Sequence, residues 1–164
     1  MSLIYNPRQL VLISCQGKHT LFGKEIEKHD ILPITWHAPA SSHPPMYAIF
    51  VNKELMGAKI IEESRCFVVN FVSYNLFESV QEKLTVSGEY SDKLGELGLR
   101  ETACEKLPDC FALRDAIGRL ECEVIESKEV GDSLMFLGRV IHSEMGNNDA
   151  RAFHMEGDRF TTTK

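Results

Sequence analysis

The chain has 164 residues, a length typical of one domain, with 43% hydrophobic and 26% charged residues, a composition that argues against a disordered chain. Its formal net charge is −6, so no global positive field attracts nucleic acid or an anionic membrane. No apolar run approaches the roughly 20 residues that span a bilayer, and no secretion signal is indicated, so we expect a cytoplasmic protein without membrane or nucleic-acid partners.

Five segments rich in Val, Ile, Phe and Tyr predict β-strands. In chain order they are Gln9–Cys15, Met46–Val51, Cys66–Val72, Arg119–Lys128 and Ser133–Glu144. The last two are separated by a short stretch that contains Gly131-Asp132, which is turn chemistry, so they are expected to form one long hairpin.

The first strand of this hairpin has a period of two. Leu120, Cys122 and Val124 alternate with Glu121 and Glu123. This alternation predicts a sheet with one solvated face.

Three short segments predict helices. Lys53–Glu63 follows Asn52, a good N-cap residue, and a second helix is expected to begin at Asn75 in a capping-box pattern. The third, Ser91–Leu97, is stopped by Gly98. Many strands with short inserted helices, rather than regular βαβ alternation, favour an antiparallel barrel or sandwich over a doubly wound sheet. No repeat or linker indicates a second domain, so one domain is expected over residues 1–164.

Several common site motifs are absent or rejected. No two glycines lie two residues apart, so the dinucleotide fingerprint GxGxxG is absent, and the segment from Gly17 to Lys24 has one residue too many for a phosphate loop. The histidines lack zinc-protease spacing, and the five cysteines include no CxxC pair, so no metal site and no disulfide framework are expected. Cys66 and Cys122 lie in apolar runs and are expected to be small buried hydrophobes.

The most informative segment is residues 34–45. Three prolines within residues 39–45 exclude a helix and predict an extended path with unpaired main-chain N–H groups. Hydroxyls at Thr35, Ser41 and Ser42 lie beside these donors, and the only tryptophan, Trp36, stands at the front. A flat ligand with a phosphate tail would suit this combination. In the alternative interpretation, the tryptophan merely plugs the end of a barrel.

The pattern Trp-x-x-Pro-x-Ser-x-x-Pro-Pro, which begins at Trp36, resembles the flavin-binding segment of flavin reductase-like proteins, especially the flavoredoxin branch. Further elements follow in the family's order, from about Arg8 to Phe160. They are the strand CFVVN at 66–70, Gly88 with SDKL at 91–94, the strand LECEV at 120–124, Gly-Asp at 131–132 with FLG at 136–138, and the tail 153–160. Each motif is weak alone, and the ordered set is fairly specific.

The resemblance implies a mainly β fold, an antiparallel Greek-key split β-barrel with short flanking helices, which forms a homodimer and holds FMN near the interface. Carried over by position, the FMN-binding residues are Thr35, Trp36, His37, Ala38, Ser41, Ser42, Lys93, His142 and Phe160. Trp36 would lie beside the flavin ring, the two serines would hold the phosphate, and Lys93 would supply the local cation that an acidic protein needs.

The same residues also have plainer interpretations. Lys93 beside Asp92 is compatible with a solvated surface, His142 with a core histidine and Phe160 with simple packing.

Three positions depart from the family's pattern. Asp30 replaces the usual Asn of the flavoredoxin branch, Gly57 replaces a hydroxyl residue, and Ser133 stands where many NAD(P)H-using reductases carry His. An ionised carboxylate accepts but cannot donate a hydrogen bond, so one flavin contact is expected to be lost or rearranged.

The resemblance implies an FMN-dependent oxidoreductase, such as an NAD(P)H:flavin or ferric reductase, in which no acid–base residue is required because flavin performs the chemistry. A non-enzymatic FMN carrier that passes electrons between protein partners is the alternative, and Ser133 favours it slightly. A split-barrel protein that has lost flavin and acts through its dimer surface is the third hypothesis.

Overall fold

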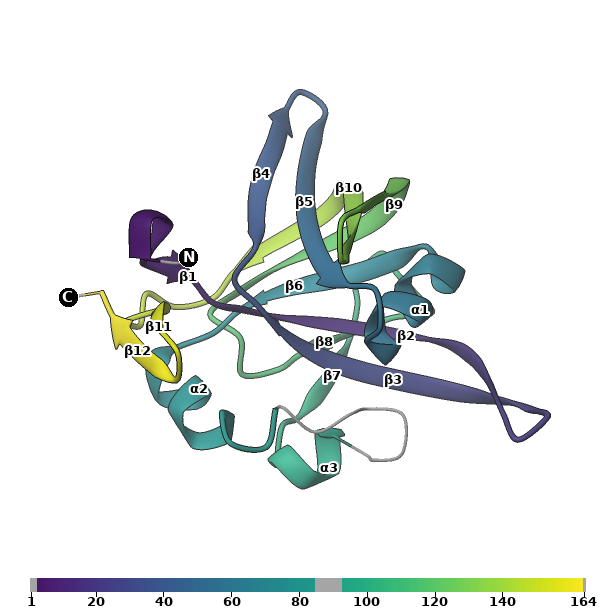
Figure 1. Cartoon of the computed structure of the whole chain (residues 1–164), viewed down its shortest axis with the longest axis horizontal. Helices are drawn as coiled ribbons and strands as arrows, with labels where there is room; N and C mark the ends of the chain where they lie inside the picture. Colours follow the sequence, from purple (N-terminus) through teal and green to yellow (C-terminus); the bar gives the residue numbers. More distant parts are fainter. Residues whose placement is uncertain (1–2, 85–92, 164) are drawn as a thin grey trace.

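The computed structural model describes residues 3–84 and 93–163, which fold around one large antiparallel sheet (Figure 1). After a 3-10 turn (Leu3–Tyr5), the first half of the chain contains β1 (Arg8–Gln9), β2 (Val11–Leu21), β3 (Lys24–Ile34), β4 (His37–Ser42), β5 (Pro45–Asn52), α1 (Met56–Ser64), β6 (Cys66–Phe71) and α2 (Tyr74–Val80). The second half contains α3 (Lys93–Leu97), β7 (Glu101–Ala103), β8 (Phe111–Leu113), β9 (Gly118–Val130), β10 (Ser133–Met145), β11 (Ala152–Glu156) and β12 (Arg159–Thr162).

The large sheet has the strand order β3-β2-β6-β9-β10-β5-β4, and its neighbouring strands are antiparallel. The sheet curves without closing, so β3 and β4 are its two edges. Small sheets β1-β11-β12 and β7-β8 complete the β-structure. The predicted fold class, a mainly β antiparallel split barrel with short flanking helices, is confirmed.

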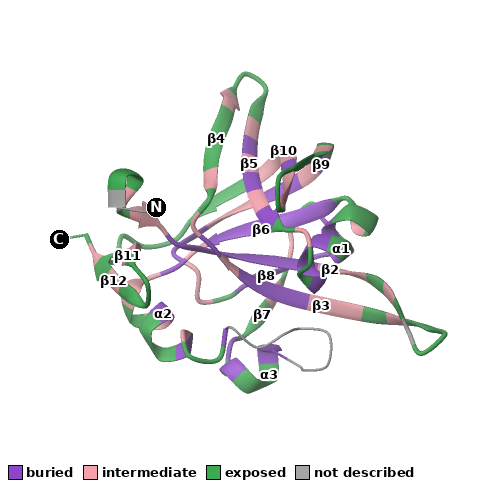
Figure 2. Ribbon diagram, in the orientation of Figure 1, coloured by how far each residue is buried: buried purple, intermediate pink, exposed green. Residues whose placement is uncertain are grey.

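Both faces of the large sheet are buried around its centre (Figure 2). Alternate residues of β2 point to opposite sides: Val11 and Ile13 pack in the cluster that contains α1, whereas Leu12 packs with α2 and α3. Period-two geometry thus gives two apolar layers from one continuous apolar run. In contrast, the ends of the β2–β3 and β4–β5 hairpins project into solvent.

The predicted β9–β10 hairpin is confirmed. Val130 pairs with Ser133 across the two-residue turn, and Gly131 has φ +59, a left-handed conformation that glycine adopts without strain.

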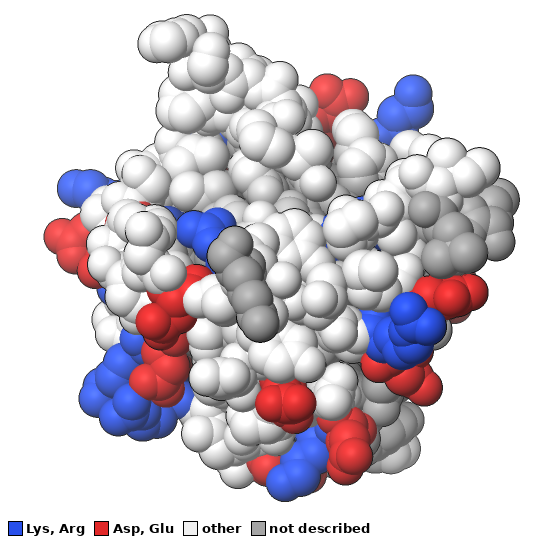
Figure 3. Space-filling view, turned by 90° about the vertical axis from the view of Figure 1, so that its left-hand side faces the viewer, with Lys and Arg blue, Asp and Glu red and all other residues white. Residues whose placement is uncertain are grey.

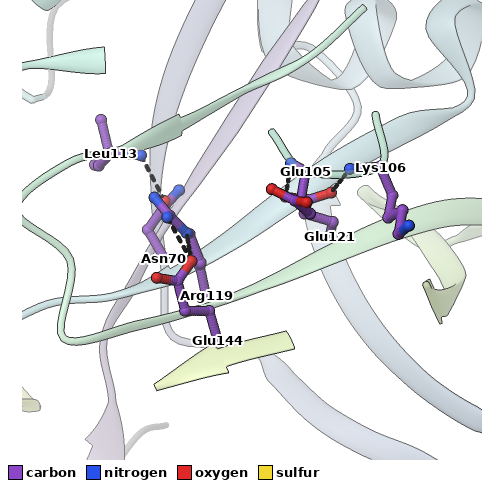
Figure 4. A network of polar contacts seen from close by, with 7 residues as sticks. All are labelled: Asn70, Glu105, Lys106, Leu113, Arg119, Glu121 and Glu144. Carbon is purple, nitrogen blue, oxygen red and sulfur yellow. Dashed lines mark hydrogen bonds and ion pairs between the residues drawn. The ribbon is translucent and has the colours of Figure 1, made fainter. Parts of the chain in front are cut away.

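The prediction of a solvated face on β9 is wrong at Glu121, whose side chain is only 1% exposed. Its carboxylate accepts hydrogen bonds from the backbone N–H groups of Glu105 at 2.6 Å and Lys106 at 2.7 Å (Figure 4). A buried carboxylate is tolerated where such donors satisfy it, so Glu121 anchors the loop after β7 rather than facing water.

The helix predicted over Lys53–Glu63 begins later than expected. Its first residue is Met56, and the preceding Leu55 provides no side-chain cap. Asn52 instead accepts a hydrogen bond from the N–H of Glu54 at 2.9 Å, which closes a turn ahead of the helix. An Asn at a strand end satisfies a turn as readily as a helix, and this explains the error.

The second helix begins one residue earlier than predicted, because Ser73, and not Asn75, is its N-cap. The Ser73 hydroxyl accepts a hydrogen bond from Leu76 N at 3.1 Å. The third helix ends before Gly98, which has φ +66, as predicted. Its predicted first residues, Ser91 and Asp92, lie outside the described residues, as does Gly88.

No helix within the described ranges has the length and apolar character that a membrane crossing requires.

Candidate functional site

The proline-containing segment forms the edge strand β4. Its extended path is confirmed, but its amides are not all unpaired, because His37 pairs with Ile49 and Ala38 with Ala48 of β5. Just before the strand, Trp36 O accepts a hydrogen bond from Phe50 N at 3.0 Å. Pro lacks an N–H group and is tolerated on an edge, so only the outer side of β4 keeps free main-chain groups.

Two adjoining hollows lie where β3 passes into β4. One has a volume of about 250 Å³ and the other about 430 Å³. Both are lined by Arg8, Thr35, His37 and Ala38. The structure therefore brings together four of the predicted ligand residues: Thr35, His37 and Ala38 line both hollows, and Trp36 lines the smaller one.

Aromatic side chains and one cation form the wall of the smaller hollow. Trp36 is 52% exposed, and its ring meets Tyr5 edge to face at 5.7 Å. The Arg8 guanidinium lies 5.0 Å from the Tyr5 ring centre and 5.3 Å from that of Trp36. Half-exposed indole beside a cation offers a flat ligand both an apolar surface and an electrostatic partner.

Arg8 is only partly satisfied by the protein. Its Nε and Nη2 atoms donate to Thr35 Oγ1 at 3.4 and 3.3 Å, and Nη2 also lies 3.3 Å from His154 Nδ1. Its Nη1 is buried and has no hydrogen-bond partner among the described residues, and neither has Gln9 Nε2. Buried donors are normally paired, so these atoms suit an acceptor supplied by a ligand, such as a phosphate or a ring carbonyl.

His37 is fixed by a hydrogen bond on each side of its ring. Nε2 donates to the carbonyl of Gln9 at 2.7 Å, so Nδ1 accepts from the Tyr47 hydroxyl at 2.7 Å. Burial lowers the pKa of His37, and burial raises the pKa of Tyr47 to about 12. A neutral imidazole acts here as a spacer that positions the first strand beside β4.

We expect His37 to make the protein less stable in mild acid. Its folded-state pKa lies below the unfolded value of about 6.5, so the unfolded chain binds the proton more readily. The contribution is complete above pH 6.5 and is lost as the pH falls through the folded-state pKa. Urea unfolding from pH 7.5 to pH 5 should show this loss, and a His37→Gln variant should have a shallower slope than a variant of exposed His43. If the two variants lost stability equally with falling pH, His37 would not be the group responsible.

The two predicted phosphate-binding serines lie at the far end of β4. Ser41 pairs with Met46, and Ser42 with Pro45, next to the hairpin tip. The Ser42 hydroxyl lies 3.2 Å from His43 Nδ1. Neither serine lines the two hollows, so their contact with a ligand stays a prediction.

Lys93 does not present an open cation. Only 4% of the residue is exposed, and its ammonium pairs with Asp30 Oδ1 at 2.9 Å and donates to Ile31 O at 3.1 Å. Asp30 Oδ1 also accepts from Ile31 N at 2.8 Å. The departure from Asn at position 30 thus creates a buried ion pair. The solvated-surface interpretation of Lys93 is wrong, and a direct ligand contact by Lys93 stays a prediction.

The last two predicted residues lie in other surroundings. His142 lies on β10, where it pairs with Glu121 of β9. It does not line either of the two hollows beside β4. Phe160 packs on Phe77 at 4.5 Å and on His154 at 5.1 Å between ring centres, and it lines a third hollow of about 440 Å³. His154 also contacts Arg8, so Phe160 packs against a residue that helps to position Arg8.

Gly57 has a packing explanation. A Cβ atom at this position would lie 2.3 Å from a methyl group of Leu32, so the close approach of α1 to β3 leaves no room for a hydroxyl side chain. The difference from the family's pattern therefore reflects helix–sheet packing.

Sequence reasoning missed the residues from elsewhere in the chain that contact Trp36 and His37. Arg8, Tyr5 and Tyr47 carry no motif or spacing that relates them to residues 34–45. Only the pairing of β1 with β11, and the passage of the chain beside β4, bring Arg8 to the hollow.

Comparison with known proteins agrees with this architecture. The model of the "Flavin reductase like domain" family matches residues 3–163. A flavoredoxin from Methanosarcina acetivorans superimposes with a TM-score of 0.82 at 22% identity, over 99% of this chain and 88% of that one. An FMN-binding protein from Thermus thermophilus, solved with 1-cyclohex-2-enone, gives 0.81 at 16% identity, over 99% and 89%. The flavin reductase HpaC, solved with NADP⁺, gives 0.73 at 17% identity, over 98% and 93%.

Proposed function

Since the chain belongs to the flavin reductase-like family, we propose that it is an FMN-binding oxidoreductase. In this proposal, electrons pass from a reduced nicotinamide or a protein donor through FMN to flavin, a ferric chelate or another acceptor. The neighbours in fold include proteins named for FMN binding and for flavin reduction, which supports this choice of cofactor and reaction class.

The observation that best supports the proposal is the unpaired, buried Nη1 of Arg8 beside the half-exposed ring of Trp36. The larger of the two adjoining hollows at this point, about 430 Å³, lies in the size range of small-molecule sites. Arg8 would bind an anionic or carbonyl oxygen of FMN, Trp36 would flank its ring, and Thr35 with the edge amides of β4 would offer further polar contacts.

Bound FMN would supply a ring that accepts and releases hydride or single electrons. The protein's own part is placement: Arg8 is oriented by Thr35 and His154, and His37 holds β4 in register with Gln9 and Tyr47. A site whose side chains are fixed before the ligand arrives loses less entropy on binding.

We also propose a homodimer built on the β4–β5 hairpin. No Lys, Arg, Asp or Glu occurs between Asp30 and Lys53, so the projecting hairpin is uncharged along its length. Seen from the side of the chain termini, the upper part of the molecule is largely free of charged side chains (Figure 3). Interface cores are poor in charge, and edge β4 offers unpaired main-chain groups.

Sedimentation velocity tests this proposal. The wild-type protein should sediment as a dimer. A variant that lacks residues 41–45, and so keeps Tyr47, should sediment as a monomer.

The cofactor is tested by absorption and by tryptophan emission. FMN added to the purified protein should bind with flavin bands that co-elute on gel filtration. Because Trp36 is the only tryptophan, its emission should be quenched by FMN. Trp36→Ala should weaken binding by about tenfold, as expected for loss of a stacked aromatic surface, whereas Trp36→Phe should keep most of the affinity. A protein that takes up no FMN would overturn the proposal and favour a split barrel that has lost flavin.

The second candidate is a non-enzymatic FMN carrier. Ser133 at the start of β10, bonded to its neighbour Asp132 at 3.1 Å, favours it because a hydroxyl replaces the histidine of many NAD(P)H-using reductases. Steady-state oxidation of NADH or NADPH with free flavin or a ferric chelate distinguishes the two: turnover by the FMN-loaded protein supports the enzyme, and its absence supports the carrier.

A further inference from the structure

Three of the five cysteines lie together, on the far side of β6 from α1. Cys66 begins β6, Cys104 follows β7 and Cys110 precedes β8, and all three are free thiols. Cys110 Sγ donates weakly to the carbonyl of Ser14 at 3.8 Å, and the neighbouring thiols of Cys66 and Cys104 shift its pKa. The three pack with Val68, Leu107 and Ala112 in a small apolar cluster, separate from the two larger cores.

The backbone places Cys104 and Cys110 opposite each other. Ala103 pairs with Phe111 at the end of the β7–β8 ladder, so residues 104 and 110 are the next cross-strand positions. Such positions have Cβ atoms about 4.5–5.5 Å apart, and a disulfide needs about 3.5–4.5 Å, so a small shift suffices. Glu121 holds the chain just after Cys104 through the amides of Glu105 and Lys106.

Cys66 borders a cavity of about 400 Å³ outside the flavin site proposed above. Three basic residues, Arg65, Lys106 and Arg139, line this cavity together with the carboxylates Asp109 and Glu123. The neighbouring Cys110 thiol lowers the pKa of Cys66, whereas the thiols of Cys104 and Cys66 raise the pKa of Cys110. Of this pair, Cys66 is thus the more acidic thiol, the one that loses its proton more readily, and Cys110 is the less acidic one.

We propose that Cys66, Cys104 and Cys110 form a redox-active thiol site that hydroperoxides oxidise to a disulfide. The Cys66 thiolate attacks one oxygen of hydrogen peroxide. The O–O bond breaks, Cys66 becomes a sulfenic acid, and the departing hydroxide takes up a proton to give water.

The disulfide then closes within the cluster. The Cys110 sulfur attacks the Cys66 sulfur, an S–S bond forms, and the S–O bond breaks. The sulfenic hydroxyl leaves with the Cys110 proton as a second water, so two thiols give two electrons to one peroxide. Cys104 can next attack Cys110, which moves the disulfide to Cys104–Cys110 and returns Cys66 as a thiol. Cys104 is the most exposed of the three, and this transfer brings the disulfide within reach of a reductant.

The other two cysteines serve as internal controls. Burial raises the pKa of Cys15 well above its usual value and that of Cys122 to about 12. Both thiols are fully buried. They are expected to react far more slowly with peroxide than Cys66.

The five cysteines fall on five separate tryptic peptides, which allows a direct test. Residues 66–83, 101–106 and 107–114 contain the proposed site, and residues 9–18 and 120–128 contain the controls. The folded, reduced protein is treated with one equivalent of hydrogen peroxide, alkylated and digested without reductant. We expect peptide 107–114 linked to 66–83 or to 101–106, with the control thiols at least about tenfold slower to react.

Two variants separate the steps. In Cys110→Ser, Cys66 should stop at the sulfenic acid and be trapped by dimedone. In Cys66→Ser, disulfide formation by one equivalent of peroxide should fall by about tenfold or more. Absence of any linked peptide from the wild-type protein, or equal oxidation of Cys15 and Cys122, would overturn the proposal whether or not the variants fold. Neither result depends on flavin, so failure here leaves the proposed function standing.

Discussion

Replacing Lys93 with methionine is expected to lower the free energy of unfolding by about 3–5 kcal/mol, as for removal of one partner from a buried ion pair. Methionine preserves the length of the side chain, so packing in α3 changes little. Among the described residues, the Asp30 carboxylate, 1% exposed, then keeps the Ile31 N–H as its hydrogen-bond donor but has no counter-charge. Urea denaturation of the purified variant measures the loss.

A double variant tests whether the unpaired charge of Asp30 causes the loss of stability in Lys93→Met. Asn at position 30 still accepts from Ile31 N but is neutral, so Asp30→Asn with Lys93→Met should recover most of the lost stability. Lys18→Met is the matched control: Lys18 pairs with Glu25 at 3.3 Å where both side chains are exposed, and its loss should cost under about 1 kcal/mol. If Lys93→Met were no less stable than Lys18→Met, the pair would contribute nothing to folding.

The buried pair also marks a limit of the sequence reasoning. The sequence relates Lys93 and Asp30 to different roles, Lys93 to a ligand cation and Asp30 to a departure from the family's pattern. Their contact depends on α3 packing against β3, a tertiary arrangement that no local spacing encodes. Single-residue matches therefore found the right positions but not the partner that each one has.

Strands with strong apolar signals were predictable, and strands without them were not. The core strands β5, β6, β9 and β10 contain apolar residues of the Val, Ile, Phe and Leu type, and their predicted bounds lie close to the observed ones. The strand predicted over Gln9–Cys15 is wrong in its bounds, because β2 spans Val11–Leu21 and its polar second half is held by pairing with β3. In contrast, β3 begins with the charged stretch from Lys24 to His29, and its first half lies in solvent. It is a strand because it pairs with β2 along its whole length, which is a consequence of tertiary contacts rather than of its own pattern.

In the candidate site too, only the residues that share one segment were predictable from the sequence. Thr35, Trp36, His37 and Ala38 are contiguous, so one segment was enough to place them together. Arg8 reaches them from the small β1-β11-β12 sheet, and its relation to Trp36 is visible only in three dimensions. The cation that the sequence reasoning sought near an anionic ligand is therefore offered by Arg8, while Lys93 is already neutralised.

Replacing Arg8 with methionine is expected to weaken FMN binding by about 10- to 100-fold, the value of one charge-assisted hydrogen bond of about 1.5–3 kcal/mol. Arg8→Lys keeps the charge but not the planar fork that spans Thr35 and a ligand, so its affinity should lie between those of the other two proteins. Arg159→Met, on an exposed residue of β12, is the control. Titration with FMN, followed by quenching of Trp36, gives the dissociation constants.

The thermal shift separates a lost ligand contact from a damaged fold. Arg8 also bonds Thr35 and His154, so Arg8→Met should have a slightly lower melting temperature without FMN. FMN that binds only the folded state raises the melting temperature with the logarithm of its concentration beyond Kd. In Arg8→Met that rise should begin at 10- to 100-fold higher FMN, by the affinity ratio expected above. If the two proteins differ without FMN but their melting temperatures begin to rise at the same FMN concentration, Arg8 is structural, and the unpaired Nη1 does not mark the cofactor site.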